Sequence, residues 1–98
     1  MSRIELAPEI ADDFDRIFDY LAAHDVSDAP ARIREIIQAI DVLEHHPLIG
    51  RPVEGGRREL VMGKAGRGYV ALYRYLPELD RVLVLAIRSQ REAGYSRS

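Results

Sequence analysis

The stretch YVALYRYLPELDRVLVLAIR, Tyr69–Arg88, carries the strongest structural signal in this chain. Its first part, Tyr69–Leu76, is rich in residues that favour extended backbone and predicts a strand. Its last part, Arg81–Arg88, is a nearly continuous apolar run, typical of a strand buried on both faces near the centre of a sheet. The short link Pro77–Asp80 suits a tight connection, so the two strands are expected to be antiparallel neighbours.

Two more segments are expected to join the same sheet. RELVM, Arg58–Met62, predicts a strand that the glycine-rich loop GKAGRG, Gly63–Gly68, connects to the next one. RIEL, Arg3–Leu6, alternates polar and apolar residues and predicts a short N-terminal strand. The segment HHPLIGRP, His45–Pro52, contains two prolines and a glycine and is expected to be irregular.

Two apolar stripes at helical spacing lie between the N-terminal strand and the later strands. Pro8 suits the first turn of the first helix, and Ser27 or Asp28 can cap the second. Because a short connector joins them, the helices are expected to form an antiparallel hairpin. The first stripe consists of Ile10, Phe14, Ile17, Phe18 and Leu21, and the second of Ile33, Ile36, Ile37, Ile40 and Leu43.

The element order β-α-α-β-β-β predicts an α+β fold in one domain covering residues 1–98. The helix hairpin is expected to cover one face of a sheet made of a three-stranded antiparallel C-terminal meander and the N-terminal strand. Four acidic residues lie mostly off the first apolar stripe and predict a solvated helix face, with a partner-binding site as the alternative. They are Asp12, Asp13, Asp15 and Asp19.

The composition of the 98 residues fits a small domain with its own core, because 47% of them are hydrophobic. The absence of cysteine and of a signal-peptide pattern favours the cytoplasm, and no stretch approaches the roughly 20 apolar residues of a membrane helix. The net charge of −2 hides an asymmetry: residues 1–50 carry 4 basic and 11 acidic groups, whereas residues 51–98 carry 10 basic and 5 acidic ones. The two halves either neutralise each other in part or leave one basic face.

Several kinds of chemistry lack their residues here. The GKAGRG loop does not have the spacing of a phosphate-binding P-loop, and no cysteine or Ser-His-Asp pattern offers a nucleophile. His45 and His46 are adjacent, so on a helix they point about 100° apart and cannot easily share one ion. They are expected to stabilise the end of the second helix. We therefore expect no metal and no cofactor.

One cluster of basic and aromatic residues is a candidate for binding. Its members come from neighbouring connections of the predicted meander, where they could converge on one face or edge of the sheet. Arginine suits phosphate and carboxylate partners because its guanidinium is a planar fork of donors that stays charged. The alternative is ordinary surface arginines with a tyrosine packed on the sheet. The set consists of Arg58, Lys64, Arg67, Arg88, Arg91 and Tyr95.

The chain resembles the RelE/ParE superfamily of toxins from bacterial type II toxin–antitoxin modules over nearly its whole length. Four stretches carry the resemblance, of which the HPLIGRP helix exit and the IRSQREAGY ending are the most specific. They are LAPEIADDFDRIFDYLA, AIDVLEHHPLIGRPV, RELVMGKAGRGYVALYRY and RVLVLAIRSQREAGY. The resemblance implies the same helix-hairpin-and-sheet fold and a toxin neutralised by a cognate antitoxin. It also implies that the toxin contacts operator DNA only through its complex with the antitoxin.

The superfamily contains two activities, and the residues separate them only in part. RelE-like members cut mRNA on the ribosome with lysines of the second strand, an arginine after a Gly-Tyr pair, and a C-terminal arginine and tyrosine. Arg88 and Tyr95 match that C-terminal pair, whereas RELVM offers no lysine and Val70 follows Gly68-Tyr69. The incomplete set favours the ParE branch, whose members inhibit DNA gyrase by binding rather than by catalysis.

Three hypotheses follow from the sequence. The first is a cytoplasmic bacterial toxin of the ParE type that inhibits DNA gyrase and is silenced by an antitoxin. The second is a RelE-like mRNA endonuclease that uses Arg88 and Tyr95. The third is a degenerate member that only forms a regulatory complex with its partner. None of the three involves a membrane.

Overall fold

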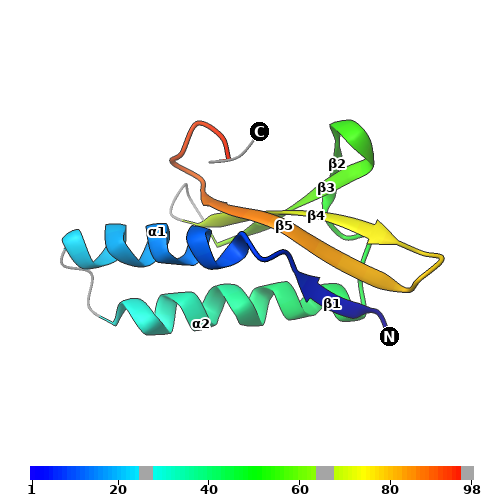
Figure 1. The fold of residues 1–98 in the computed structure, drawn as a ribbon, viewed down its shortest axis with the longest axis horizontal. Coiled ribbons are helices and arrows are strands. Elements are labelled where there is room, and N and C mark those ends of the chain that lie inside the picture. Colours follow the sequence, from blue (N-terminus) through cyan, green and yellow to red (C-terminus); the bar gives the residue numbers. More distant parts are fainter. Residues whose placement is uncertain (25–27, 64–67, 96–98) are drawn as a thin grey trace.

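The computed structural model describes residues 1–24, 28–63 and 68–95, and it confirms the predicted α+β fold (Figure 1). Helices α1 and α2 lie side by side on one face of the sheet and form the predicted hairpin. The elements are β1 (Arg3–Leu6), α1 (Ile10–Ala23), α2 (Ala29–Ile40), the 3-10 turn η1 (Asp41–Glu44), β2 (Arg51–Val53), the 3-10 turn η2 (Glu54–Gly56), β3 (Arg57–Met62), β4 (Tyr69–Leu76) and β5 (Arg81–Ser89).

The sheet has five strands in the order β1-β5-β4-β3-β2. The strands β3, β4 and β5 form the predicted antiparallel meander, and β1 runs parallel to β5. The expectation of an irregular chain through Pro52 is wrong at its end, because Arg51–Val53 pairs with β3 as strand β2. Proline is tolerated there because β2 is an edge strand with only one neighbour.

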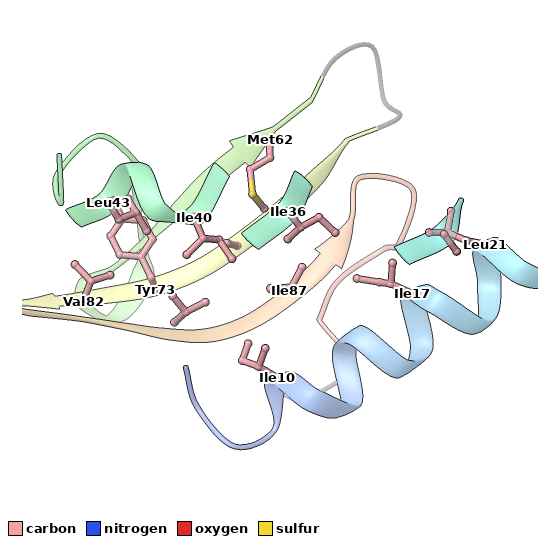
Figure 2. Close-up of a cluster of buried hydrophobic side chains, with 13 residues drawn as sticks. Ile10, Ile17, Leu21, Ile36, Ile40, Leu43, Met62, Tyr73, Val82 and Ile87 are labelled. Carbon is pink, nitrogen blue, oxygen red and sulfur yellow. The ribbon is translucent and has the colours of Figure 1, made fainter. Parts of the chain in front are cut away.

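The main core lies between the helices and the sheet (Figure 2). Spacings of three and four residues along both helices bring one stripe of each onto the sheet, as the sequence predicts. Phe18 and Ile37 belong to the predicted stripes but stay about 40% exposed at their edges. The largest buried contributions come from Ile10, Ile17, Leu21, Ile36, Ile40, Leu43, Met62, Tyr73, Val82, Val84 and Ile87.

The apolar run of β5 predicts a strand buried on both faces, but one face of β5 is buried more deeply than the other. Val82, Val84 and Ile87 are fully buried against the core, whereas Leu83 and Leu85 are half-buried. The register with β4 also shifts by one residue, because Leu72 lies opposite Ala86 whereas Tyr73 lies opposite Val84, which marks a β-bulge at this point of the strand. The bulge brings Ile87, three residues after Val84, back to the face that packs on the core. For this reason the run does not show the two-residue period of a regular strand.

The HPLIGRP segment is held by the hydroxyl of Tyr73. This hydroxyl donates to the carbonyl oxygen of Pro47 at 2.8 Å and accepts from the backbone N–H of Gly50 at 2.9 Å. A Cβ atom at Gly50 would lie 2.6 Å from the same hydroxyl and 2.8 Å from the carbonyl oxygen of Glu59. The chain therefore needs glycine where the helix exit turns into β2.

In the described part of the chain, neither helix has the length and apolar character that crossing a membrane requires.

Candidate functional site

The face of the sheet opposite the helices carries a polar cluster centred on the carboxylate of Glu59 in β3. Tyr95 donates its hydroxyl to Glu59 at 2.6 Å, and Arg51 of β2 pairs with it at 2.8 Å. Arg88 of β5 lies 4.0 Å from the same carboxylate. We call these four residues the Glu59 cluster. The C-terminal segment that contains Tyr95 curls over this face, away from the helices (Figure 1).

The outer face of the sheet also carries a second, smaller apolar surface. Val70, Leu72 and Ala86 are buried, yet they do not belong to the core under the helices. Leu72 pairs with both Glu59 and Ala86 across the sheet, so these side chains share the outer face with the Glu59 cluster. The chain after β5 folds back onto this face, because the Tyr95 hydroxyl reaches Glu59 of β3.

The environment of the Glu59 cluster changes its proton affinities. Burial tends to raise the pKa of Glu59, but hydrogen bonds from Tyr95 and Arg51 and the charges of Arg51 and Arg88 outweigh it and leave the pKa lowered. Burial and the hydrogen bond to Glu59 raise the pKa of the Tyr95 phenol far above its ordinary value. At neutral pH the cluster therefore holds an ionised Glu59 and a protonated Tyr95.

Arg88 is used inside the protein. Its guanidinium donates to the carbonyl oxygens of Ser89 and Glu92 at 3.1 and 3.2 Å, and it lies 5.1 Å from the centre of the Tyr95 ring. Only 16% of the side chain is exposed. Its Nε atom is buried and has no hydrogen-bond partner among the described residues. Arg88 thus links β5 to its own C-terminal tail, with one donor to spare.

A second polar cluster seals the edge of β5 that β1 leaves uncovered. The pairing of β1 with β5 ends at Leu6 and Val84. Beyond it, the backbone N–H of Ile87 donates to Asp13 at 3.0 Å, and the carbonyl oxygen of Ile87 accepts from Arg16 at 2.9 Å. Side chains of α1 therefore replace a neighbouring strand.

The predicted solvated face of α1 is wrong at Asp13, which is 0% exposed. Arg16 pairs with this carboxylate at 2.8 Å and with Glu92 of the tail at 2.8 Å. Glu92 also accepts the backbone N–H of Ser89 at 2.7 Å. A buried carboxylate is tolerated here because a guanidinium and a backbone donor both compensate its desolvation.

The predicted basic cluster assembles only in part. Arg88 and Tyr95 meet at Glu59, as described above. Arg58 instead donates to the carbonyl oxygens of Leu48 and Gly50, at 3.2 and 2.8 Å, and so fixes the HPLIGRP segment. Arg91 lies exposed on the tail. Lys64 and Arg67 lie outside the described residues, as does Ser27, so that Asp28 is the cap that the structure describes for α2.

A cavity with a volume of about 600 Å³ lies between the helices and the tail. Arg16, Ile17, Tyr20 and Leu21 of α1 line it together with Arg32 of α2, and its other walls are Gly68, Tyr69, Ser89, Arg91 and Glu92. We call it the interhelix–tail cavity. Arg91 is the one described member of the predicted basic cluster that lines it.

The described residues contain no group of three or more His, Asp or Glu side chains placed to hold a metal ion. His45 and His46 are exposed and follow η1, where both backbone N–H groups donate to the carbonyl oxygen of Val42. Their backbone N–H groups thus close the end of this helical segment.

Glu59 and Glu92, which connect the candidate residues, were not among the predicted site residues, and Asp13 was predicted to lie on a solvated face. Asp13 had a detectable signal, because it lies three residues after Ile10 and four before Ile17, on the apolar stripe. Glu59 had none, since its partners Arg51 and Tyr95 are 8 and 36 residues away and meet it only through the sheet register and the folded-back tail.

Comparisons with known proteins bear on this arrangement. Residues 4–94 match the family model described as the ParE toxin of a type II toxin–antitoxin system, parDE. A solved structure titled "Chromosomal ParDE TA system from P. aeruginosa" is similar to the chain, with a TM-score of 0.76 and 22% sequence identity. The match covers 91% of this chain and 96% of that one, and at this identity it supports the fold. No curated protein matches the sequence.

Proposed function

Because this chain belongs to the ParE toxin family of type II toxin–antitoxin systems, we propose that it inhibits DNA gyrase by binding and that a cognate antitoxin neutralises it. The proposal places the pair in the bacterial cytoplasm, where gyrase acts. It also assigns contact with operator DNA to the toxin–antitoxin complex and not to the toxin alone.

The position of Glu59 is the observation that favours binding over RNA cleavage. A ribonuclease of the RelE type would need Arg88 to stabilise charge on a phosphate and Tyr95 to transfer a proton. Glu59 lies between them, 2.6 Å from the Tyr95 hydroxyl and 4.0 Å from the Arg88 guanidinium. A phosphodiester entering here would meet a carboxylate that is held ionised, and the two negative charges would repel each other.

Two further observations support the same choice. Val70 occupies the position after Gly68-Tyr69 and is buried, so this position supplies no cation to the outer face. Burial and the bond to Glu59 also raise the pKa of Tyr95, which makes its phenol a weaker proton donor at neutral pH. Deletion of one charge-stabilising donor costs roughly 3–4 kcal/mol of barrier in other enzymes.

One observation favours the RelE-like alternative, namely that Arg88 and Tyr95 do lie together, 5.1 Å from guanidinium to ring centre. For this pair to act on RNA, the tail would have to move and release Glu59. The alternative therefore predicts that loss of the Glu59 charge increases RNA cleavage, whereas the gyrase proposal predicts no cleavage in either form.

Purified components separate these functions. The toxin is added to gyrase in a DNA supercoiling assay and, separately, to translating ribosomes with an mRNA reporter, with and without the antitoxin encoded beside it. We expect supercoiling to fall and to recover when the antitoxin is added, and mRNA to stay intact. The Glu59→Gln variant is included in the ribosome assay, and Glu54→Gln, an exposed glutamate before β3, is its matched control.

The outcomes differ for each hypothesis. Unchanged supercoiling at a saturating dose of folded toxin would contradict the gyrase proposal. Cleaved mRNA, lost in Arg88→Ala, would favour the endonuclease. Binding of the antitoxin without an effect on either assay or on cell growth would leave a member that only forms a regulatory complex.

A further inference from the structure

The interhelix–tail cavity is a built recess with polar and apolar walls. Its volume of about 600 Å³ falls in the range of about 300–1,000 Å³ that is common for ligand sites. It is bounded by α1, by Arg32 of α2, by the start of β4 at Gly68 and Tyr69, and by the tail residues Ser89, Arg91 and Glu92. None of the functions considered above uses these walls.

The apolar part of the cavity suits a large side chain. Ile17 and Leu21 are buried, and Tyr69 is half-buried at the start of β4. Tyr20 leaves 49% of its surface exposed, and its ring stacks on His24 at 4.1 Å between centres. This stacking holds the ring in place without hiding it, so an incoming aromatic or long aliphatic side chain meets a fixed aromatic wall.

The charged part of the cavity contains arginine side chains that can pair with an anionic group. Arg16 is committed to Asp13 and Glu92. Arg32 pairs with Glu35 only at 3.5 Å, and both side chains are more than half exposed, so this ion pair exchanges readily with solvent or a partner. Arg91 is exposed and forms no ion pair with any described residue.

We propose that the interhelix–tail cavity binds a segment of the antitoxin in which a large apolar side chain adjoins an aspartate or glutamate. The apolar side chain enters between Tyr20 and Tyr69, and the carboxylate pairs with Arg32 and Arg91. This inference rests on the proposed neutralisation by an antitoxin and names the chemistry of that contact. It combines an apolar anchor with charge-assisted hydrogen bonds, a pairing that gives binding hot spots.

The same walls argue against nucleic acid as the occupant. Glu92 lies in the cavity wall and Glu35 beside Arg32, so a phosphate chain would meet carboxylates as well as guanidinium groups. A short peptide segment needs only one or two anion contacts. The recess also offers an apolar interior, which a peptide side chain fills and a phosphate does not.

The test measures the affinity of the neighbouring antitoxin for variants of the full-length toxin. The informative variants are Arg32→Glu, Arg91→Glu and Tyr20→Ala, all at exposed positions, with Arg34→Glu as the matched control because it is exposed on the same helix but does not line the cavity. We expect each charge reversal to weaken binding about tenfold or more and the control to bind as the wild type does. Circular dichroism and thermal unfolding check that each variant is folded.

Each result decides the matter. Wild-type affinity in all three cavity variants would overturn the inference while leaving neutralisation by the antitoxin intact. Failure of the wild-type toxin to bind the antitoxin at all would overturn both. If a single-stranded oligonucleotide probe loses binding to Arg32→Glu while the antitoxin does not, the cavity is a nucleic-acid site and the inference is wrong. Recovery of Arg32→Glu binding by an acidic-to-basic change in the antitoxin would identify the carboxylate.

Discussion

The carboxylate of Asp13 accepts the backbone N–H of Ile87 at 3.0 Å and so ties α1 to β5 where the pairing with β1 has ended. Strand β1 is only four residues long, and beyond its end a helix side chain accepts the hydrogen bond that a neighbouring strand would otherwise accept. Arg16 and Glu92 extend the connection to the C-terminal tail. One polar network therefore connects the first helix, the central part of the sheet and the tail.

Replacing Asp13 by alanine is expected to destabilise the protein strongly. The substitution leaves the buried N–H of Ile87 without its acceptor and removes a carboxylate partner from Arg16. Breaking a buried pair on one side costs about 3–5 kcal/mol. Denaturant unfolding measures the loss, with Asp12→Ala as the control, since Asp12 is exposed on the same turn. Similar stabilities for the two variants would show that water replaces the carboxylate at little cost.

Local patterns in the sequence predicted most of the fold. Helical apolar stripes and the strand-favouring stretch Tyr69–Arg88 act over a few residues, and they placed the hairpin and the meander correctly. Strand β2 was missed because a strand of three residues with Pro52 in its middle has no periodicity to detect. Only the register with β3, a long-range property, makes it a strand.

Gly50→Ala is expected to destabilise the fold by displacing the HPLIGRP segment. The added methyl group would lie 2.6 Å from the Tyr73 hydroxyl and 2.8 Å from the Glu59 carbonyl oxygen, and Tyr73 is fully buried and cannot move aside. Overpacking of this kind costs about 1–3 kcal/mol. Gly94→Ala is the control, because a Cβ there meets no atom within 4 Å among the described residues. Equal thermal unfolding midpoints would show that the segment shifts freely.

The Glu59 cluster predicts a pH dependence of stability. The pKa of Glu59 is lower in the folded protein than its ordinary value, so its ionised form stabilises the fold above the ordinary pKa of a glutamate, near 4.3. This stabilisation is lost as the pH falls through the lower, folded-state pKa. Glu59→Gln should therefore lose less stability on acidification than the wild type, measured by urea unfolding at a series of pH values. Glu54→Gln should follow the wild type, and parallel curves for all three proteins would contradict the assignment.

The candidate site was less predictable than the fold. The sequence identified Arg88 and Tyr95, because a planar cation and an aromatic ring after an apolar strand are visible locally. It did not indicate that Glu59 lies between them, 2.6 Å from the Tyr95 hydroxyl and 4.0 Å from the Arg88 guanidinium. Contacts between charged residues of different strands depend on strand register, and contacts with the tail depend on how the tail folds back. Neither kind of contact has a fixed sequence spacing that a single sequence could reveal.

Tyr95→Phe is expected to release the C-terminal tail while leaving the main core intact. The change removes a 2.6 Å hydrogen bond to the ionised Glu59, and bonds to charged groups contribute about 1.5–3 kcal/mol. Because the phenylalanine ring can still lie under Arg88, the loss reports the hydroxyl alone. Hydrogen exchange should show faster exchange in residues 88–95 and unchanged exchange in β4, whereas Tyr20→Phe, at an exposed ring, should alter neither region.

A pH titration followed by phenolate absorbance tests the same contact. The wild type should contain a phenol that ionises well above the ordinary range, because burial and Glu59 raise the pKa of Tyr95. Burial also raises the pKa values of Tyr69 and Tyr73, so the decisive result is the difference between the two proteins: a titration of Tyr95→Phe that loses no high-pKa phenol would contradict the assignment to Tyr95.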